Sequence, residues 1–314
     1  MSAQRRGKTP KKPAGGRKGA APGPKPRRAK AAGPRRTGAR PTSSRRTKKP
    51  TAEHPTDKEM GKQRIQKVLA SFGFASRRAV EEMVAEGRIS VNGRKVAKLP
   101  CFVDPQVDDI RIDGSTLRLG HDRRRVYYLL NKPRGVLCTQ VDPSGRPRAV
   151  DLVPQAPGRI YCVGRLDKES TGLLILTNDG ELTEYLTHPS HGVMKTYVVE
   201  VDGRVTGDQI DRLKKGLYID GKRTRGPRIK VLRRRPKTTS LEVGLTEGRN
   251  REIRRMLARL GNKVRRLKRT AIGPVTDRGL KIGSHRELTP REVARLRTCG
   301  RANGVGRRRR AAQR

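Results

Sequence analysis

Tryptophan is absent from this chain of 314 residues, and aromatic residues make up only 3% of it. Long apolar runs are missing too. No stretch approaches the roughly 18 residues that a membrane-spanning helix needs, and the first residues hold no apolar secretory core. We therefore expect no membrane association and a cytoplasmic location.

Cysteine and histidine are sparse, which argues against a metal site. The cysteines are Cys101, Cys138, Cys162 and Cys299. No pair has the close spacing of a zinc knuckle or a redox motif, so we expect reduced and mostly buried thiols. His188 and His191 are close in sequence, but we identify no acidic or cysteine partner for them. The sequence thus implies no metal.

Acidic residues are outnumbered by basic ones, 29 to 76, which gives a formal net charge of +47. Residues 1–50 contain 18 Lys or Arg and no Asp or Glu. Such a segment buries too little apolar surface to fold, so we expect disordered basic tails at residues 1–62 and 300–314. Both tails would attract phosphates through counterion release. The chain between them is also basic, and this excess predicts a polyanionic partner, nucleic acid first.

A first compact domain is expected at residues 63–120. Apolar residues with i, i+3, i+4, i+7 spacing predict an amphipathic helix from Ile65, and Ser76 suits the N-cap of a second helix. Asn92–Gly93 predicts a tight turn between two short strands. The strands are expected at 88–91, 94–96, 109–112 and 117–119. Two helices and a small sheet with basic side chains predict an RNA-binding module, and its RNA-contacting candidates are Arg64, Arg77 and Arg78.

A second, larger domain is expected at residues 126–299, after a basic linker at 120–125. Its β-rich runs alternate with fewer helical ones, which indicates an α+β domain with a mainly antiparallel sheet. We expect strands at 126–130, 160–163, 173–176, 196–201 and 240–245, and helices near 181–187, 206–215 and 250–260. About 175 residues suffice for a single core.

The most informative segment of this domain runs from Gly164 to Gly180. It places one carboxylate, Asp167, in a turn between two apolar runs, with Arg165 and Lys168 close by. A turn on a rigid scaffold is a good place for a reactive group, and nearby cations favour an ionised nucleophile or base. From the spacing alone, an ordinary charged hairpin turn remains an open alternative.

A helix expected at 250–260 presents an arginine at the edge of its buried face. Its apolar residues Ile253 and Met256 lie on one face, and Gly261 provides a C-terminal stop. At about 100° per residue, Arg251 falls opposite that face, as do Arg255 and Arg259, towards solvent or RNA phosphate. Arg254 falls at the boundary, where an arginine can reach inward to a carboxylate.

The chain resembles the bacterial rRNA-modifying pseudouridine synthases of the RsuA/RluB type. Three motifs carry the resemblance, in the family's order: the segment from Gly164 to Gly180, Lys195-Thr196-Tyr197, and the segment from Glu247 to Leu257. Residues 64–96 resemble the domain named after small-subunit ribosomal protein S-four. The family usually has Gln where this chain has Glu252, which leaves the role of that residue open.

The resemblance implies that a uridine in ribosomal RNA is isomerised without a cofactor. Asp167 would be the catalytic aspartate, acting on the sugar as nucleophile or base. Tyr197 would stack on the target base and assist proton removal, although a lone strand tyrosine is usually a core residue. Arg254 would pair with the aspartate.

Other residues are expected near the substrate. Arg165, Lys195 and Leu267 are candidates for binding the target nucleotide, with a plain core role equally open for Leu267. Lys132 and Arg134, in the motif Asn131–Gly135, are expected near RNA. The partner is expected to be 23S ribosomal RNA or a pre-ribosomal particle, and the protein a monomer.

Two other classes of function would also involve ribosomal RNA. A non-catalytic RNA-binding or ribosome-assembly factor fits the charge equally well, but would be expected to lack one of the three catalytic residues. An rRNA methyltransferase would need a glycine-rich loop between a strand and a helix, and the sequence offers no convincing candidate.

Overall fold

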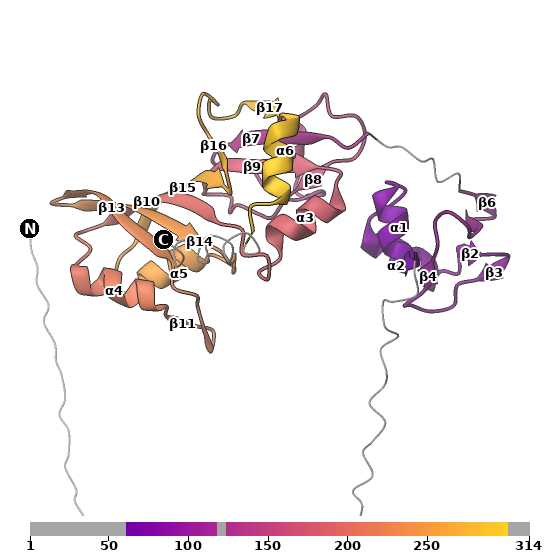
Figure 1. The fold of residues 1–314 in the computed structure, drawn as a ribbon, viewed down its shortest axis with the longest axis horizontal. Coiled ribbons are helices and arrows are strands. Elements are labelled where there is room, and N and C mark those ends of the chain that lie inside the picture. Colours follow the sequence, from indigo (N-terminus) through magenta and orange to yellow (C-terminus); the bar gives the residue numbers. More distant parts are fainter. Residues whose placement is uncertain (1–60, 118–123, 301–314) are drawn as a thin grey trace, which may run out of the picture. The chain divides into compact units, whose positions relative to one another are not determined.

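The computed structural model describes residues 61–117 and 124–300, which form a small domain and a larger one (Figure 1). Apart from residues 61, 62 and 300, the expected tails lie outside the described residues, as does most of the expected linker. Within the described ranges, no helix is long and apolar enough to cross a membrane.

The small domain contains the two expected helices, α1 (Ile65–Ser71) and α2 (Arg77–Ala85). Ser76 caps α2 as predicted, because its Oγ accepts a hydrogen bond of 3.0 Å from the amide of Ala79. The apolar sides of both helices bury Ile65, Val68 and Val80 in one core.

Short strands complete the small domain. They are β1 (Gln63–Arg64), β2 (Ile89–Val91), β3 (Arg94–Lys95), β4 (Phe102–Val103), β5 (Ile110–Ile112) and β6 (Ser115–Thr116), with β1 paired to β4 and the others in the order β3-β2-β5-β6. Asn92 and Gly93 have φ angles of 51° and 78°, as the predicted hairpin turn requires. Residues 118 and 119 of the strand expected at 117–119 lie outside the described residues, and β6 ends at Thr116, just before it. A second turn of the same kind, at Asp113–Gly114, starts β6 immediately afterwards.

The larger domain is built on one sheet with the path β13-β14-β10-β15-β9-β7-β17, to which β8 and β16 pair at β9 and β15. Its strands are β7 (Tyr127–Lys132), β8 (Tyr161–Cys162), β9 (Thr171–Thr177), β10 (Lys195–Asp202), β13 (Arg228–Arg235), β14 (Thr238–Leu245), β15 (Val264–Ile272), β16 (Val275–Thr276) and β17 (His285–Glu287). A separate hairpin pairs β11 (Tyr218–Ile219) with β12 (Lys222–Arg223). The β9–β15 pair is parallel and the other strand pairs are antiparallel, which confirms the predicted α+β class with a mainly antiparallel sheet.

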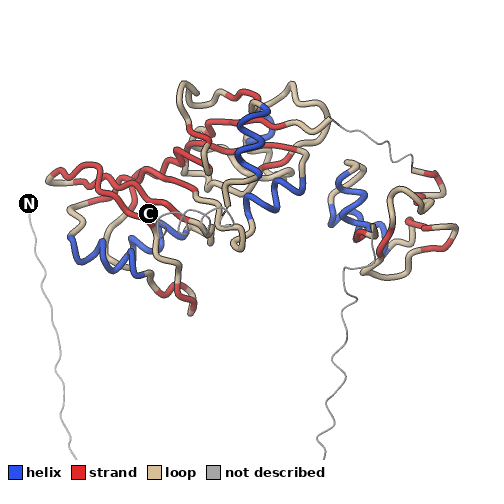
Figure 2. Tube along the Cα trace, viewed as in Figure 1, coloured by secondary structure: helices blue, strands red, loops and turns tan. Residues whose placement is uncertain are grey.

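Helices cover the two halves of this sheet (Figure 2). They are α3 (Gly180–Thr187), α4 (Gly207–Lys215), α5 (Glu252–Ala258) and α6 (Pro290–Arg297), with a short 3-10 helix at Ala149–Leu152. One core joins α4 and α5 to β10, β14 and β15, and another joins α3 and α6 to β7 and β9. Strand β15 lies between β10 and β9 and therefore connects the two halves.

Several elements were not expected from sequence. Strand β13 has the sequence RIKVLRRR and is mostly exposed. Its many charged residues obscure the alternating apolar pattern of Ile229 and Val231, so the sequence did not predict a strand. Such charges suit an edge strand, where they oppose pairing with another chain. Helix α6 carried a clear signal in Thr289, Pro290 and Glu292, a capping box with proline in the first turn. Residues 265–269, which include the candidate Leu267, lie within β15, and β16 and β17 follow it.

Candidate active site

Asp167 lies in the loop between β8 and β9, and backbone hydrogen bonds fix this loop. The carbonyl of Asp167 accepts a bond of 3.0 Å from the amide of Ser170, which closes a tight turn. The carbonyl of Lys168 accepts a bond of 2.8 Å from the amide of Gly135, so the segment after β7 supports the loop from outside. The Asp167 side chain is 28% exposed, held in place but accessible to a ligand.

The residue before Asp167 anchors the loop in the core. Leu166 is buried in the same apolar cluster as Tyr197 and Leu267. Its amide lies 3.4 Å from the Sγ of Cys138, which accepts the hydrogen bond. The loop therefore turns around a buried leucine and leaves the neighbouring carboxylate at the surface.

Gly172 allows the loop to join the sheet. Its φ is 105°, a conformation that favours glycine, and a Cβ there would lie 2.2 Å from the carbonyl oxygen of Arg269. Because β9 and β15 approach so closely at this point, the Asp167 loop is drawn against the middle of the sheet.

Two arginines approach the Asp167 carboxylate. Its Oδ2 lies 3.8 Å from the Nε of Arg254 and 3.5 Å from a terminal nitrogen of Arg251. Both guanidiniums also lie within 4.0 Å of the Glu169 carboxylate. The structure thus brings Arg254 to Asp167 as the sequence predicted, and adds Glu169, which the sequence reasoning missed.

Arg254 is held mainly by its own surroundings. Its side chain is 11% exposed, and a terminal nitrogen donates a hydrogen bond of 3.2 Å to the carbonyl of Val264. Burial lowers the pKa of this guanidinium and the charge of Arg251 adds to that effect, whereas Glu169 and Asp167 oppose it. The buried Nε has no hydrogen-bond partner among the described residues, so a small shift of Asp167 would supply one.

The expected position of Arg251 was wrong. Helix α5 begins at Glu252, and Arg251 precedes it in a left-handed conformation with φ of 48°, so the helical-face argument does not apply to it. Its guanidinium lies near the Asp167 carboxylate, and its side chain is 44% exposed. Arg255 and Arg259, placed on the outer face, bond to the carboxylate of Asp220 and the carbonyl of Tyr218.

Sheet register brings Tyr197 and Leu267 towards the loop. Tyr197 on β10 pairs with Arg269 on β15, which in turn pairs with Gly172 on β9. Tyr197 is 8% and Leu267 is 7% exposed, so both are largely core residues in this structure. Their contact with a target base remains a prediction.

Lys195 starts the same strand and is partly buried. Its Nζ donates a hydrogen bond of 3.3 Å to the carbonyl of Val193. Burial, together with the positive charge of Arg269, lowers the pKa of Lys195 to about 8. A substrate contact by this amine also remains a prediction.

The expected RNA contact of Lys132 needs correction. Lys132 ends β7 with no exposed surface, and its Nζ donates bonds of 2.8 Å to the carbonyls of Pro133 and Val136. It holds the following turn in shape, and a buried ammonium cannot reach phosphate in this arrangement. Arg134 and Arg165 are exposed, as an RNA contact would require.

The candidates in the small domain lie at its surface. Arg64, Arg77 and Arg78 are exposed, and the guanidinium of Arg64 lies 6.0 Å from the centre of the Phe102 ring. Their contact with RNA stays a prediction.

A pair of buried acids lies at the start of α5. Glu252 is 3% exposed and its Oε2 accepts a hydrogen bond of 3.0 Å from the amide of Arg249. Burial and a hydrogen bond with Glu247 raise the pKa of Glu252 to about 8. Glu247 accepts a bond of 2.6 Å from the amide of Arg225 and lies 3.3 Å from the Nε of Arg249. At neutral pH the neutral carboxyl of Glu252 can donate a hydrogen bond, as a glutamine would.

Two further clusters were not expected. Glu184 on α3 lies one turn before His188, the C-cap of that helix, and its carboxylate is 3.3 Å from the Nε2 of His191. An acidic partner therefore accompanies these histidines, and the expectation that none does was wrong. One ligand atom from each of the three lies within 4.8 Å of the others, so among residues 61–117 and 124–300 this group could hold a metal. Cys138 and Cys162, distant in sequence, share a hydrogen bond that lowers the pKa of Cys138 to about 6.

Comparison with known proteins assigns families to both domains. Residues 126–259 match the profile described as RNA pseudouridylate synthase, and residues 63–99 match the S4 domain. A Bacillus subtilis protein named ribosomal large subunit pseudouridine synthase B is 40% identical over 237 residues, 75% of this chain and 96% of the relative. An uncharacterized RNA pseudouridine synthase of Aquifex aeolicus is 40% identical over 74% of this chain and 93% of its own length.

A solved structure agrees with these matches. A crystal structure of a pseudouridylate synthase shares 28% sequence identity, with a TM-score of 0.55, and the similarity covers 74% of this chain and 99% of the other.

Proposed function

The chain belongs to the RNA pseudouridine synthase family, and from this we propose that it isomerises a uridine of large-subunit ribosomal RNA with Asp167 as the catalytic residue. The observation that carries the proposal is the ion-paired Asp167 in the loop before β9, presented beside Arg254. We propose that it acts in the cytoplasm as a monomer.

The reaction needs little from the protein beyond position and charge. The bond between the sugar and a ring nitrogen breaks, the base turns, and the same sugar carbon bonds to a ring carbon. That ring carbon loses a proton and the ring nitrogen gains one, so atoms and electrons balance without a redox step. A carboxylate at the sugar suits this chemistry as nucleophile or base.

Each neighbour of Asp167 has a proposed role. Arg254 orients the carboxylate, because its guanidinium is anchored to Val264 and leaves its Nε free to bond. Arg251 adds a second positive charge beside it. Tyr197 would stack on a flipped base, since any base offers a flat face, once a small movement exposes its ring.

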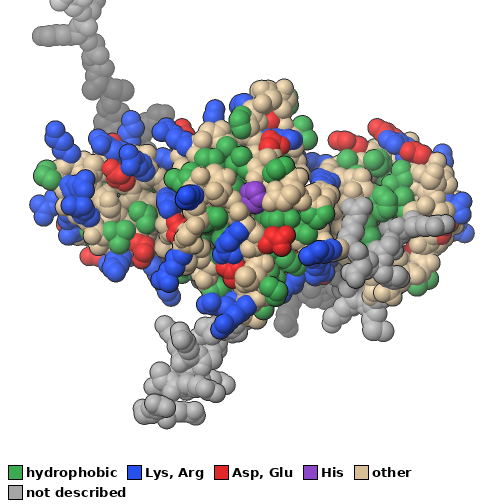
Figure 3. Space-filling model, turned by 90° about the horizontal axis from the view of Figure 1, so that it is seen from above, with side chains coloured by type: hydrophobic (Ala, Val, Ile, Leu, Met, Phe, Trp, Pro, Cys, Tyr) green, Lys and Arg blue, Asp and Glu red, His purple; other side chains and the backbone are tan. Residues whose placement is uncertain are grey.

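The rest of the molecule would hold the RNA. Lys and Arg side chains spread over the face of the larger domain shown in Figure 3, with fewer acidic ones among them. Flipping a base costs a few kcal/mol, and contacts to several phosphates can offset that cost. Arg64, Arg77, Arg78, Arg134 and Arg165 are the exposed candidates for such contacts.

Mapping pseudouridine in ribosomal RNA from cells that lack this protein tests the proposal. We expect one large-subunit position to lose pseudouridine and to regain it when the wild-type chain is supplied. An unchanged map, or a loss confined to small-subunit RNA, would overturn the assigned substrate.

A further inference from the structure

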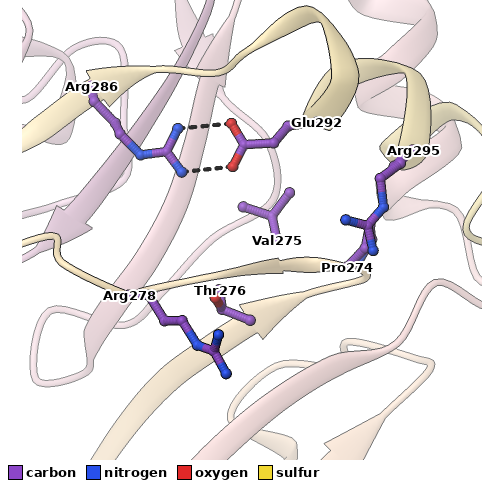
Figure 4. Close-up of a pocket in the computed structure, with 7 residues that line it drawn as sticks. All are labelled: Pro274, Val275, Thr276, Arg278, Arg286, Glu292 and Arg295. Atoms are coloured by element: carbon purple, nitrogen blue, oxygen red, sulfur yellow. Dashed lines mark hydrogen bonds and ion pairs between the residues drawn. The ribbon is translucent and has the colours of Figure 1, made fainter.

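A pocket of about 360 Å³ lies in the larger domain between β16, β17 and α6 (Figure 4). Its lining residues are Pro274, Val275, Thr276, Arg278, Arg286, Glu292 and Arg295. Three arginines from three different segments therefore line one pocket. None of its residues belongs to the Asp167 loop or to α5.

One of these arginines is already neutralised. Arg286 on β17 holds the Glu292 carboxylate through two bonds of 2.8 and 2.7 Å, drawn as dashed lines in Figure 4. This contact lowers the pKa of Glu292 to about 2, so the carboxylate stays charged. Glu292 also accepts a bond of 2.9 Å from the amide of Thr289 at the start of α6. The Arg286–Glu292 ion pair therefore lines one side of the pocket without adding net charge to it.

The other two arginines have no such partner. Arg278, after β16, and Arg295, on α6, are exposed, and within the described residues neither guanidinium has an ion pair or hydrogen bond with another side chain. The only carboxylate of the pocket is committed to Arg286. The pocket thus carries about two uncompensated positive charges.

The lining favours a phosphate group over other ligands. Guanidinium groups match the oxygens of phosphate in geometry and charge. The ring of Pro274, with the buried Val275 behind it, is uncharged and suits contact with a sugar rather than with a second charged group. No aromatic ring lines the pocket, so it offers a nucleobase no surface for stacking.

We propose that this pocket binds one phosphodiester group of the RNA backbone, apart from the catalytic loop, through Arg278 and Arg295. The proposal rests on the RNA substrate proposed above. It makes the C-terminal part of the sheet a second anchoring point for the strand, one that positions RNA without reading its sequence.

The test compares two double variants, each made in an Asp167→Asn background so that no product forms during the measurement. Arg278→Gln/Arg295→Gln removes the free charges of the pocket and leaves the Arg286–Glu292 pair intact. Arg159→Gln/Arg291→Gln removes the same charge from exposed positions outside the pocket. Binding of a large-subunit rRNA fragment is measured over a range of salt concentrations.

We expect the pocket variant to bind RNA about tenfold more weakly and its slope of log affinity against log salt to decrease by about one. The control should change both quantities much less. Equal slopes in the two double variants would overturn the proposal.

A titration with uridine monophosphate separates the backbone from a free nucleotide as the source of phosphate. If both double variants bind uridine monophosphate with similarly low affinity, the result supports the RNA backbone as the source of the phosphate. Loss of tight nucleotide binding in the pocket variant alone, with RNA affinity unchanged, would overturn the proposal. Failure of the catalytic assignment would be seen separately, as product formed by the Asp167→Asn protein.

Discussion

Replacing Glu252 by Gln should stabilise the protein at alkaline pH and have little effect at acidic pH. Glu252 is buried beside Glu247, and this raises its pKa from 4.5 to about 8. A negative charge at a helix N-terminus is favoured by about 0.3–1 kcal/mol. Burying an ionised carboxylate beside another acid costs several kcal/mol. The cost of burial therefore dominates at this position.

The sign follows from the two pKa values. Below pH 4.5 the carboxyl is protonated in both the folded and unfolded states, so burial carries no penalty. Between pH 4.5 and about 8 only the unfolded state releases the proton, and the free energy of unfolding falls as pH rises. Above pH 8 the free energy of unfolding stops falling, after a total decrease of about 5 kcal/mol. Glutamine cannot ionise and can keep a hydrogen bond to Glu247.

Urea unfolding at pH 5 and pH 8.5 measures the effect. The Glu252→Gln protein should match the wild type at pH 5 and unfold at a clearly higher urea concentration at pH 8.5. Glu242→Gln, on β14, removes one negative charge from a less buried position and serves as the control. A Glu252→Gln protein that gains no more than this control at pH 8.5, or gains mainly at pH 5, would refute the reasoning.

Three other changes have defined outcomes. Arg254→Gln should lower the rate of pseudouridine formation by at least about 100-fold in a single-turnover assay, with RNA affinity unchanged; a rate near wild type would contradict its role. Gly172→Ala should lower the free energy of unfolding by more than about 2 kcal/mol, because the new methyl group meets the Arg269 backbone; an unchanged urea midpoint would contradict this. At pH 7, Cys138 should react with iodoacetamide faster than Cys299, since the pKa of Cys138 is lowered and that of Cys299 is raised by burial; equal rates by mass spectrometry would argue against a thiolate at Cys138.

Local signals in the sequence were reliable where the chain determines its own conformation. Ser76 caps its helix, and Asn92–Gly93 forms its turn, because neighbouring residues decide both. The boundary position of Arg254 on α5 also followed from helical spacing, and the structure places it at Asp167. Its catalytic role stays a prediction.

The failures share a physical cause, because each depends on local backbone geometry and hydrogen bonding that residue spacing alone does not specify. Arg251 was misplaced because α5 starts at Glu252, two residues later than the helix expected at 250–260. Lys132 is buried because two backbone carbonyls satisfy its ammonium, which no local pattern reveals. The acid pair of Glu247 and Glu252 likewise forms only when the preceding loop folds against α5.

Pseudouridine formation by the Asp167→Asn protein on unmodified large-subunit rRNA tests the central claim most directly, with RNA affinity measured on the same preparation. Asparagine keeps the size of the side chain but cannot act as the nucleophile or base. We predict no detectable pseudouridine with RNA affinity within about twofold of wild type. Product formation by the variant at a rate near wild type would contradict the assignment of Asp167.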